Sequence, residues 1–153
     1  MIITRAPLRI SFVGGGTDIK EFYEQYPGRV ISSTIDKYVY TVVNHARLLD
    51  TLVVKYSETE IVQSLSDLKH GRFREALRQL QMPGNGLEIA SFADLPSRTG
   101  LGSSSSFSVA LLKALHAHLD KPIDKRTLAE HACMLEIDTL KEPIGKQDQY
   151  AAA

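Results

Sequence analysis

Residues 94–107 read Asp94-Leu-Pro-Ser-Arg-Thr-Gly-Leu-Gly-Ser-Ser-Ser-Ser-Phe107, and this stretch decides the fold. Before it, residues 87–92 form an apolar run of the kind found in strands. After it, apolar residues recur at three- and four-residue steps, which predicts a helix over residues 104–119. Glycines let a ligand approach the backbone closely, and serines before a helix cap its amides or leave them directed at an anion. The stretch therefore predicts a phosphate-binding turn between a strand and a helix.

Three interpretations of this turn compete. A serine-capped turn without a ligand is the simplest of them. A dinucleotide-binding fingerprint would use Gly100, Gly102 and Ser105, but it needs an acidic residue at the end of the next strand. Asp120 lies at the right distance yet directly follows the predicted helix, so that interpretation fails. The Walker motif, which closes on Gly-Lys-Ser/Thr, is also absent, and a phosphate loop of another kind remains.

The composition excludes several classes of protein. With 153 residues, the chain is long enough for one domain, and its 43% hydrophobic and 24% charged residues are ordinary for a soluble protein. Because 18 basic residues balance 18 acidic ones, we expect neither nucleic acid nor a membrane surface as a partner. The N-terminus lacks a signal-peptide pattern. The single cysteine, Cys133, fits a reducing cytoplasm, and we expect it to pack on a helix face without binding zinc.

The first half of the chain predicts a mixed or antiparallel sheet. Short strands are expected over residues 1–6 and 8–13, separated by Pro7. A three-glycine run then leads into a short helix over residues 19–25, capped by Thr17 or Asp18. A meander should follow, with strands over residues 29–35, 38–44 and 51–56 and turns at residues 36–37 and 47–50.

The second half of the chain predicts three helices besides the one after the phosphate loop. The first covers residues 64–81, and its basic side chains are expected on a solvated face: Lys69, Arg72, Arg74 and Arg78. The second runs over residues 124–140 and is capped by Asp124. A third begins near Lys146, after a Pro-Ile-Gly break.

Four charged residues lie where phosphoryl transfer would need them. Such transfer uses amides around the phosphates, a metal ion, a group that orients or deprotonates the nucleophile, and a cation for developing charge. Beyond the loop itself, the candidates are Arg9, Asp18, Glu136 and Asp148. Each could equally be an ordinary surface charge. Their setting favours a site, because Arg9 and Asp18 flank the glycine run and Asp148 begins a helix.

The motifs resemble those of the GHMP kinases, the family of galactokinase, homoserine kinase and mevalonate kinase. The loop from Pro96 to Ser106 is similar to the family's Pro-x-x-x-Gly-Leu-Gly-Ser-Ser segment. Residues 5–18 resemble the first motif, in which galactokinases match at Arg9 and Asp18 but differ at residues 8, 15 and 16. Residues 145–150, Gly-Lys-Gln-Asp-Gln-Tyr, complete a set most similar to that of the D-glycero-D-manno-heptose 7-phosphate kinases.

The resemblance implies a fold, a reaction and a role for each site residue. The fold is the family's N-terminal α/β (α+β) domain, a mixed sheet packed against helices, ribosomal-protein-like with a βαβ crossover. The reaction is ATP- and Mg²⁺-dependent phosphorylation of a sugar's anomeric hydroxyl in the cytoplasm. By resemblance, Asp148 is the base, Arg9 stabilises it, and Ser104 and Glu136 bind the metal. The sugar contacts Gly15, Gly16, Thr17 and Asp18, and ATP contacts Pro96, Gly100, Leu101, Gly102, Ser103, Ser104 and Ser105.

The resemblance leaves the substrate and the extent of the protein open. Heptose 7-phosphate is the first expectation, with fucose, galactose or a uronic acid as alternatives. The family's third motif belongs to a C-terminal domain, and nothing in residues 1–153 matches it, so this single domain reads as truncated. A rival hypothesis is therefore a non-catalytic nucleotide- or sugar-binding module, in which a homodimer covers the exposed surface.

Overall fold

The computed structural model describes residues 1–46, 50–96 and 99–153, and it is built on one five-stranded sheet. The strand order is β1-β2-β5-β3-β4. Neighbouring strands are antiparallel except β3 and β5, which run parallel. The predicted mixed sheet is therefore confirmed, and the crossover joins β3 to β5 through β4 and a helix. The strands are β1 (Ile2–Val13), β2 (Ile31–His45), β3 (Leu52–Lys55), β4 (Thr59–Val62) and β5 (Leu87–Ala93).

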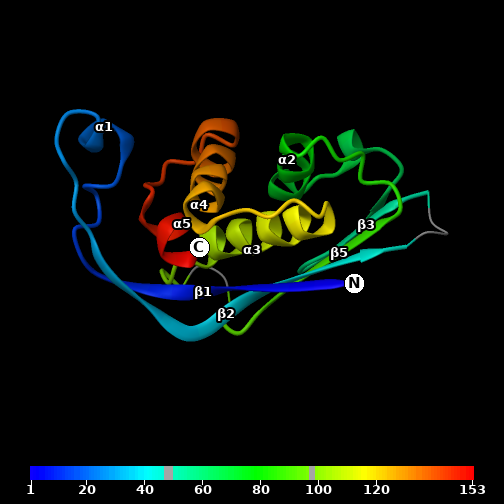
Figure 1. Ribbon diagram of the computed structural model, residues 1–153, viewed down its shortest axis with the longest axis horizontal. Helices are drawn as coiled ribbons and strands as arrows, with labels where there is room; N and C mark the ends of the chain where they lie inside the picture. Colours follow the sequence, from blue (N-terminus) through cyan, green and yellow to red (C-terminus); the bar gives the residue numbers. More distant parts are fainter. Residues whose placement is uncertain (47–49, 97–98) are drawn as a thin grey trace.

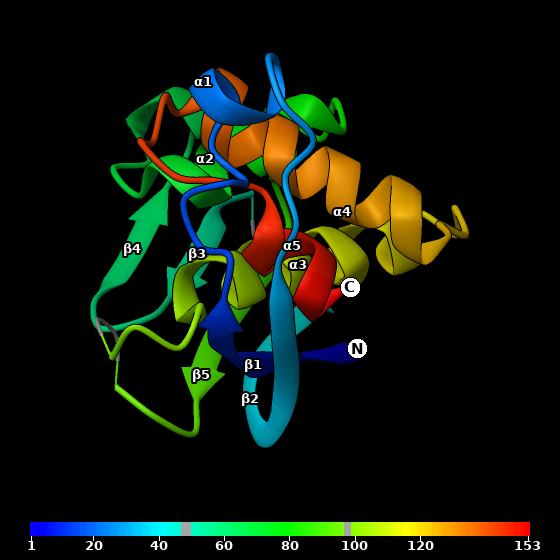
Figure 2. The same cartoon turned by 90° about the vertical axis from the view of Figure 1, so that its left-hand side faces the viewer.

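The helices α2, α3 and α4 lie on one face of the sheet (Figure 1). Helix α3 packs against β1 and β2, and the core forms around its fully buried Leu111, Leu112 and Leu115. Figure 2 shows α5 against α3, beside β1. The α-helices are α1 (Lys20–Tyr23), α2 (Gly71–Gln79), α3 (Ser103–His118), α4 (Lys125–Cys133) and α5 (Gln147–Ala152); a 3-10 turn covers Leu65–Asp67 and a π-helix covers Met134–Thr139.

Two predicted strand breaks are wrong. The strand β1 continues through Pro7, because β1 is an edge strand of the sheet and an edge position tolerates a residue without an amide hydrogen. The strand β2 continues through the expected turn at residues 36–37, which form part of a bulge instead. Between the pairs Pro7–Tyr38 and Arg9–Thr34, residues 35–37 lie opposite Leu8 alone.

The predicted meander is also wrong, because β5 lies between β2 and β3. The sequence prediction missed β4 altogether. Of the turn expected at residues 47–50, residues 47–49 lie outside the described residues.

The helix boundaries agree best around the phosphate loop. Helix α3 begins and ends within one residue of its prediction, and Asp124 caps α4 by accepting a bond from the amide of Thr127. The helix predicted over residues 64–81 is interrupted, because Leu68 and His70 have extended backbone before α2 begins. Helix α1 is shorter than predicted, and its N-cap is Ile19, without a side-chain cap.

Cys133 is buried as expected, and burial raises the pKa of its thiol to about 12. Within the described ranges, none of the helices has the length and apolar character needed to cross a membrane.

Candidate active site

The phosphate loop is attached to the edge strand β1. Its Leu101 carbonyl accepts a bond of 3.0 Å from the Arg9 amide, and Ser106 Oγ donates to the Pro7 carbonyl at 2.7 Å. Helix α3 begins directly after Gly102, whose φ is +74°. The first amides of α3 are therefore presented beside a turn with a left-handed residue, which is an arrangement that suits an anion.

A cleft of about 900 Å³ opens in front of this loop. Five of the seven residues predicted to contact ATP line it: Pro96, Gly100, Gly102, Ser103 and Ser104. Leu101 and Ser105 do not, and Ser105 is buried beneath the loop, where it binds a carboxylate. Residues 97 and 98 of the loop lie outside the described residues.

Arg9 and Asp148 form a bidentate ion pair at the edge of this cleft. Arg9 Nε donates to Oδ1 and Nη2 to Oδ2, each at 2.7 Å, and Nη1 donates to the Gly100 carbonyl. The two charged residues predicted to act at the reaction centre are thus brought together from opposite ends of the chain. Gly102 makes room for the pair, since a Cβ there would lie 3.3 Å from both Arg9 Cγ and Asp148 Oδ2.

Glu136 is fully buried and accepts four hydrogen bonds. Ser105 and Gln149 donate to Oε2, at 2.8 and 2.5 Å. Oε1 accepts from Ser108 at 2.8 Å and from Arg72 Nε at 3.3 Å. A buried charge requires such partners, because its desolvation is otherwise far more costly than any packing gain. Glu136 therefore connects α3, the π-helix, α5 and α2.

Arg72 also binds two other groups near the phosphate loop. Its Nη2 donates to Ser104 Oγ and, at 2.5 Å, to Glu142 Oε2. Burial raises the pKa of Glu142 above its ordinary value, although the neighbouring Arg72 acts in the opposite direction. Arg72 and Ser104 line the cleft, whereas Glu136 does not. The guanidinium thus lies between the buried carboxylate and the cleft.

The two predicted magnesium ligands share one cation in this structure. Among the residues that the structure describes, no cluster of three or more His, Cys, Asp or Glu side chains could hold a metal ion. Ser104 and Glu136 nevertheless both accept hydrogen bonds from the guanidinium of Arg72, so the two side chains face one cationic group. Hard oxygens around a cationic group suit magnesium, which takes its other ligands from water and phosphates. The donor atoms of the pair are therefore of the kind that this ion prefers.

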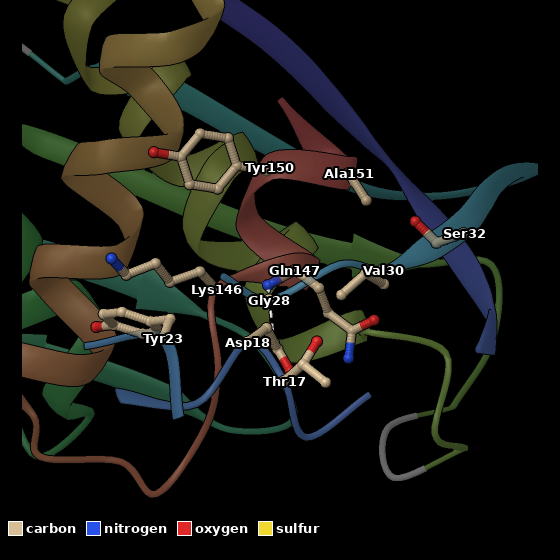
Figure 3. Close-up of a pocket in the computed structure, with 10 residues that line it drawn as sticks. All are labelled: Thr17, Asp18, Tyr23, Gly28, Val30, Ser32, Lys146, Gln147, Tyr150 and Ala151. Carbon is tan, nitrogen blue, oxygen red and sulfur yellow. Dashed lines mark hydrogen bonds between the residues drawn. The ribbon is translucent and has the colours of Figure 1, made fainter. Parts of the chain in front are cut away.

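Thr17 and Asp18 line a second cavity, of about 490 Å³ (Figure 3). The Asp18 carboxylate accepts from the amides of Gly16, at 3.1 Å, and Gln147, at 3.0 Å. Gly145 permits this approach, because a Cβ there would collide with Asp18. The ammonium of Lys146 lies 3.7 Å from the centre of the Tyr23 ring. Gly15 and Gly16, also predicted to contact the sugar, are not among the residues that line this cavity.

Sequence reasoning missed Arg72, Ser108 and Gln149. Arg72 was expected on a solvated helix face, and its side chain is instead only 22% exposed and bound to two carboxylates. Its neighbours Arg74 and Arg78 pair with Glu75 instead. No local pattern could have separated these arginines, since the partners of Arg72 lie 64 and 70 positions further along the chain.

Comparison with known proteins places these features in a family. The family description "GHMP kinases N terminal domain" matches residues 67–153. The D-glycero-alpha-D-manno-heptose 7-phosphate kinase of Campylobacter jejuni is 29% identical, over 99% of this chain and 48% of its own length. A mevalonate kinase of Archaeoglobus fulgidus is 30% identical, over 73% of this chain and 43% of its own length.

A solved structure of another heptose kinase has the same fold as this chain. The D-glycero-D-manno-heptose 1-phosphate kinase of Bacteroides thetaiotaomicron superposes with a TM-score of 0.89 at 27% identity, over 100% of this chain and 53% of its own. The chain thus spans about half the length of the relatives it matches. The phosphate loop, the sheet and the matched residues lead to one conclusion: the chain belongs to the GHMP kinase family.

Proposed function

We propose that this chain forms the ATP-binding part of a cytoplasmic sugar kinase, which transfers the γ-phosphate of ATP to the anomeric hydroxyl of a sugar. The proposal rests above all on the ion pair of Arg9 and Asp148 beside the first turn of α3. A carboxylate fixed next to a phosphate-binding helix start can orient a hydroxyl group and accept its proton.

Each residue has a defined task in this reaction. Asp148 accepts the proton of the sugar hydroxyl, whose oxygen forms a bond to the γ-phosphorus as the bond to ADP breaks. Arg9 holds both carboxylate oxygens in place, and each oxygen keeps a lone pair for the substrate. The amides at the start of α3 bind the phosphates. Magnesium, when bound through Ser104 and Glu136, would supply positive charge for the phosphate chain.

The preferred acceptor is D-glycero-D-manno-heptose 7-phosphate. It is favoured by the Campylobacter jejuni relative, whose name specifies that substrate, at 29% identity over nearly the whole chain. The glycine run with Thr17 and Asp18 would hold the sugar, and the second cavity offers room beside it. Fucose, galactose and uronic acids are the alternatives. Initial rates with each sugar, and with heptose with and without its 7-phosphate, would choose among them.

The test of the mechanism is Asp148→Asn, with Asp138→Asn as a matched control on the π-helix outside the cleft. We expect Asp148→Asn to reduce sugar-dependent ADP release by about 10²- to 10⁴-fold, the usual share of general base catalysis. ATP affinity, measured by calorimetry, should change little in both variants. Retained turnover in Asp148→Asn would exclude it as the base. If the wild-type protein binds ATP or sugar but never transfers phosphate, it is a binding module instead.

A further inference from the structure

Arg72 enters the cleft from an element that carries no other part of the phosphate site. It is the second residue of α2, and its side chain reaches the first turn of α3, the buried Glu136 and the segment before α5. Two of these three partners are the side chains predicted to bind magnesium. The guanidinium therefore contacts both side chains that the resemblance assigns to the metal.

Arg72 is held less closely by Glu136 than by Ser104 or Glu142. Its 3.3 Å bond to Glu136 is the longest of the four that this carboxylate accepts. If Arg72 withdraws, Oε1 keeps the Ser108 bond and has a lone pair available to a cation. The bond to Glu142, at 2.5 Å, gives the guanidinium a second carboxylate to stay with. Among the described residues, Arg72 Nη1 has no hydrogen-bond partner, so it remains free to donate to a phosphate oxygen.

We propose that Arg72 occupies the cation position of the phosphate site while the cleft holds no nucleotide, and that it yields this position when a phosphate chain arrives. An arriving phosphate offers the guanidinium a new bidentate partner, which compensates for the lost contacts with Ser104 and Glu136. The divalent cation and the nucleotide are consequently taken up together, and the cation alone binds poorly. The inference rests on the proposed function in treating the cleft as the nucleotide site and Ser104 and Glu136 as the metal ligands.

The test measures how tightly Mn²⁺ binds to wild type and to variants, each free of metal and nucleotide. Binding is followed by the loss of the electron paramagnetic resonance signal of the free ion. Arg72→Gln removes the competing charge, and we expect it to bind Mn²⁺ about tenfold or more tightly than wild type, the value of one hydrogen bond to a charged group. Arg78→Gln is the matched control, because Arg78 is also on α2 and paired with a carboxylate but does not line the cleft. It should behave as wild type.

A second variant covers the case in which Arg72→Gln does not fold. Arg72→Lys keeps the charge, but an ammonium group cannot bridge Ser104 and two carboxylates as the planar guanidinium does. It should bind Mn²⁺ with an affinity between those of wild type and Arg72→Gln. If whichever of these two variants folds binds Mn²⁺ no better than wild type, the inference is overturned. The inference would also be overturned if wild type bound Mn²⁺ as tightly as Arg72→Gln does in the absence of nucleotide.

The same samples separate this inference from the proposed function. Addition of a non-hydrolysable ATP analogue should bring the Mn²⁺ affinity of wild type up to that of Arg72→Gln, after subtraction of the Mn²⁺ that the analogue binds in a protein-free sample. A wild-type protein that binds no nucleotide would contradict the proposed function, whereas the nucleotide-free comparison would still decide the role of Arg72.

Discussion

Replacing Glu136 with glutamine should remove a large part of the stability of the domain. The change keeps the shape of the side chain but takes away the charge that four donors share: Arg72, Ser105, Ser108 and Gln149. The amide still has one acceptor oxygen, and both serine hydroxyls can rotate to accept bonds. About two charge-assisted bonds are then lost, at roughly 1.5–3 kcal/mol each.

An independent estimate gives a similar value. Breaking a buried ion pair by removal of one partner costs about 3–5 kcal/mol. Arg72 is 22% exposed and keeps Glu142 as a partner, so the lower end of this range applies. We therefore expect a loss of about 3 kcal/mol in the free energy of unfolding, which is a substantial fraction of the roughly 5–15 kcal/mol of a typical domain.

Urea denaturation in the presence of a chelator measures this loss without a contribution from metal binding. The transition midpoint should fall while the m-value stays unchanged. Glu130→Gln is the control, because Glu130 pairs with Arg126 on the exposed surface of α4, and solvent screening leaves such a pair with little effect on stability. If Glu136→Gln costs less than about 1 kcal/mol, Glu136 does not connect the helices in the way described.

Two further changes test the loop and the core. Gly102→Ala adds a Cβ at φ +74°, 3.3 Å from Arg9 Cγ and Asp148 Oδ2. We expect a stability loss of about 1–2 kcal/mol in urea denaturation, together with slower phosphate transfer, measured by ADP release. Unchanged turnover would show that the ion pair tolerates displacement. Burial, with a smaller effect of His131, lowers the pKa of His116 below 6.5, so the folded state favours the neutral imidazole. The free energy of unfolding therefore decreases as the pH falls below about 6.5. His116→Phe should reduce the pH dependence of the free energy of unfolding by up to about 1.4 kcal/mol per pH unit. If the urea midpoints of the variant depend on pH between 7.5 and 5.5 as those of wild type do, the assignment to His116 is contradicted.

The sequence was most informative where local chemistry dictates the structure. The glycine and serine pattern of the phosphate loop placed the start of α3 within one residue, and Asp124 was recognised as the cap of α4. It failed where tertiary contacts override local preference. Pro7 remains in a strand because β1 is an edge strand, and residues 36–37 form part of a bulge within β2 because β1 continues alongside them.

In the candidate site, too, some residues could be predicted from the sequence and others depend on tertiary contacts. The resemblance supplied Arg9 and Asp148, and the structure brings these two residues into contact. Arg72 had no distinguishing local signal, since three arginines on one helix look alike until their distant carboxylates are placed. The buried position of Glu136 behind Arg72 was likewise beyond any periodicity argument, because it depends on the packing of α2 against α3 and the π-helix.

The bond between Arg9 and Asp148 joins residues 139 positions apart, and it has a consequence for how the chain folds. The two residues meet where β1, α3 and α5 pack together, so the completed site depends on long-range contacts. Chains dominated by such distant contacts fold slowly, commonly in milliseconds to seconds. A ligand that binds only the folded site would raise the free energy of unfolding by about 2.7 kcal/mol at a hundredfold excess over its dissociation constant. Under the proposed function, ATP would then stabilise the folded chain as well as serve as its substrate.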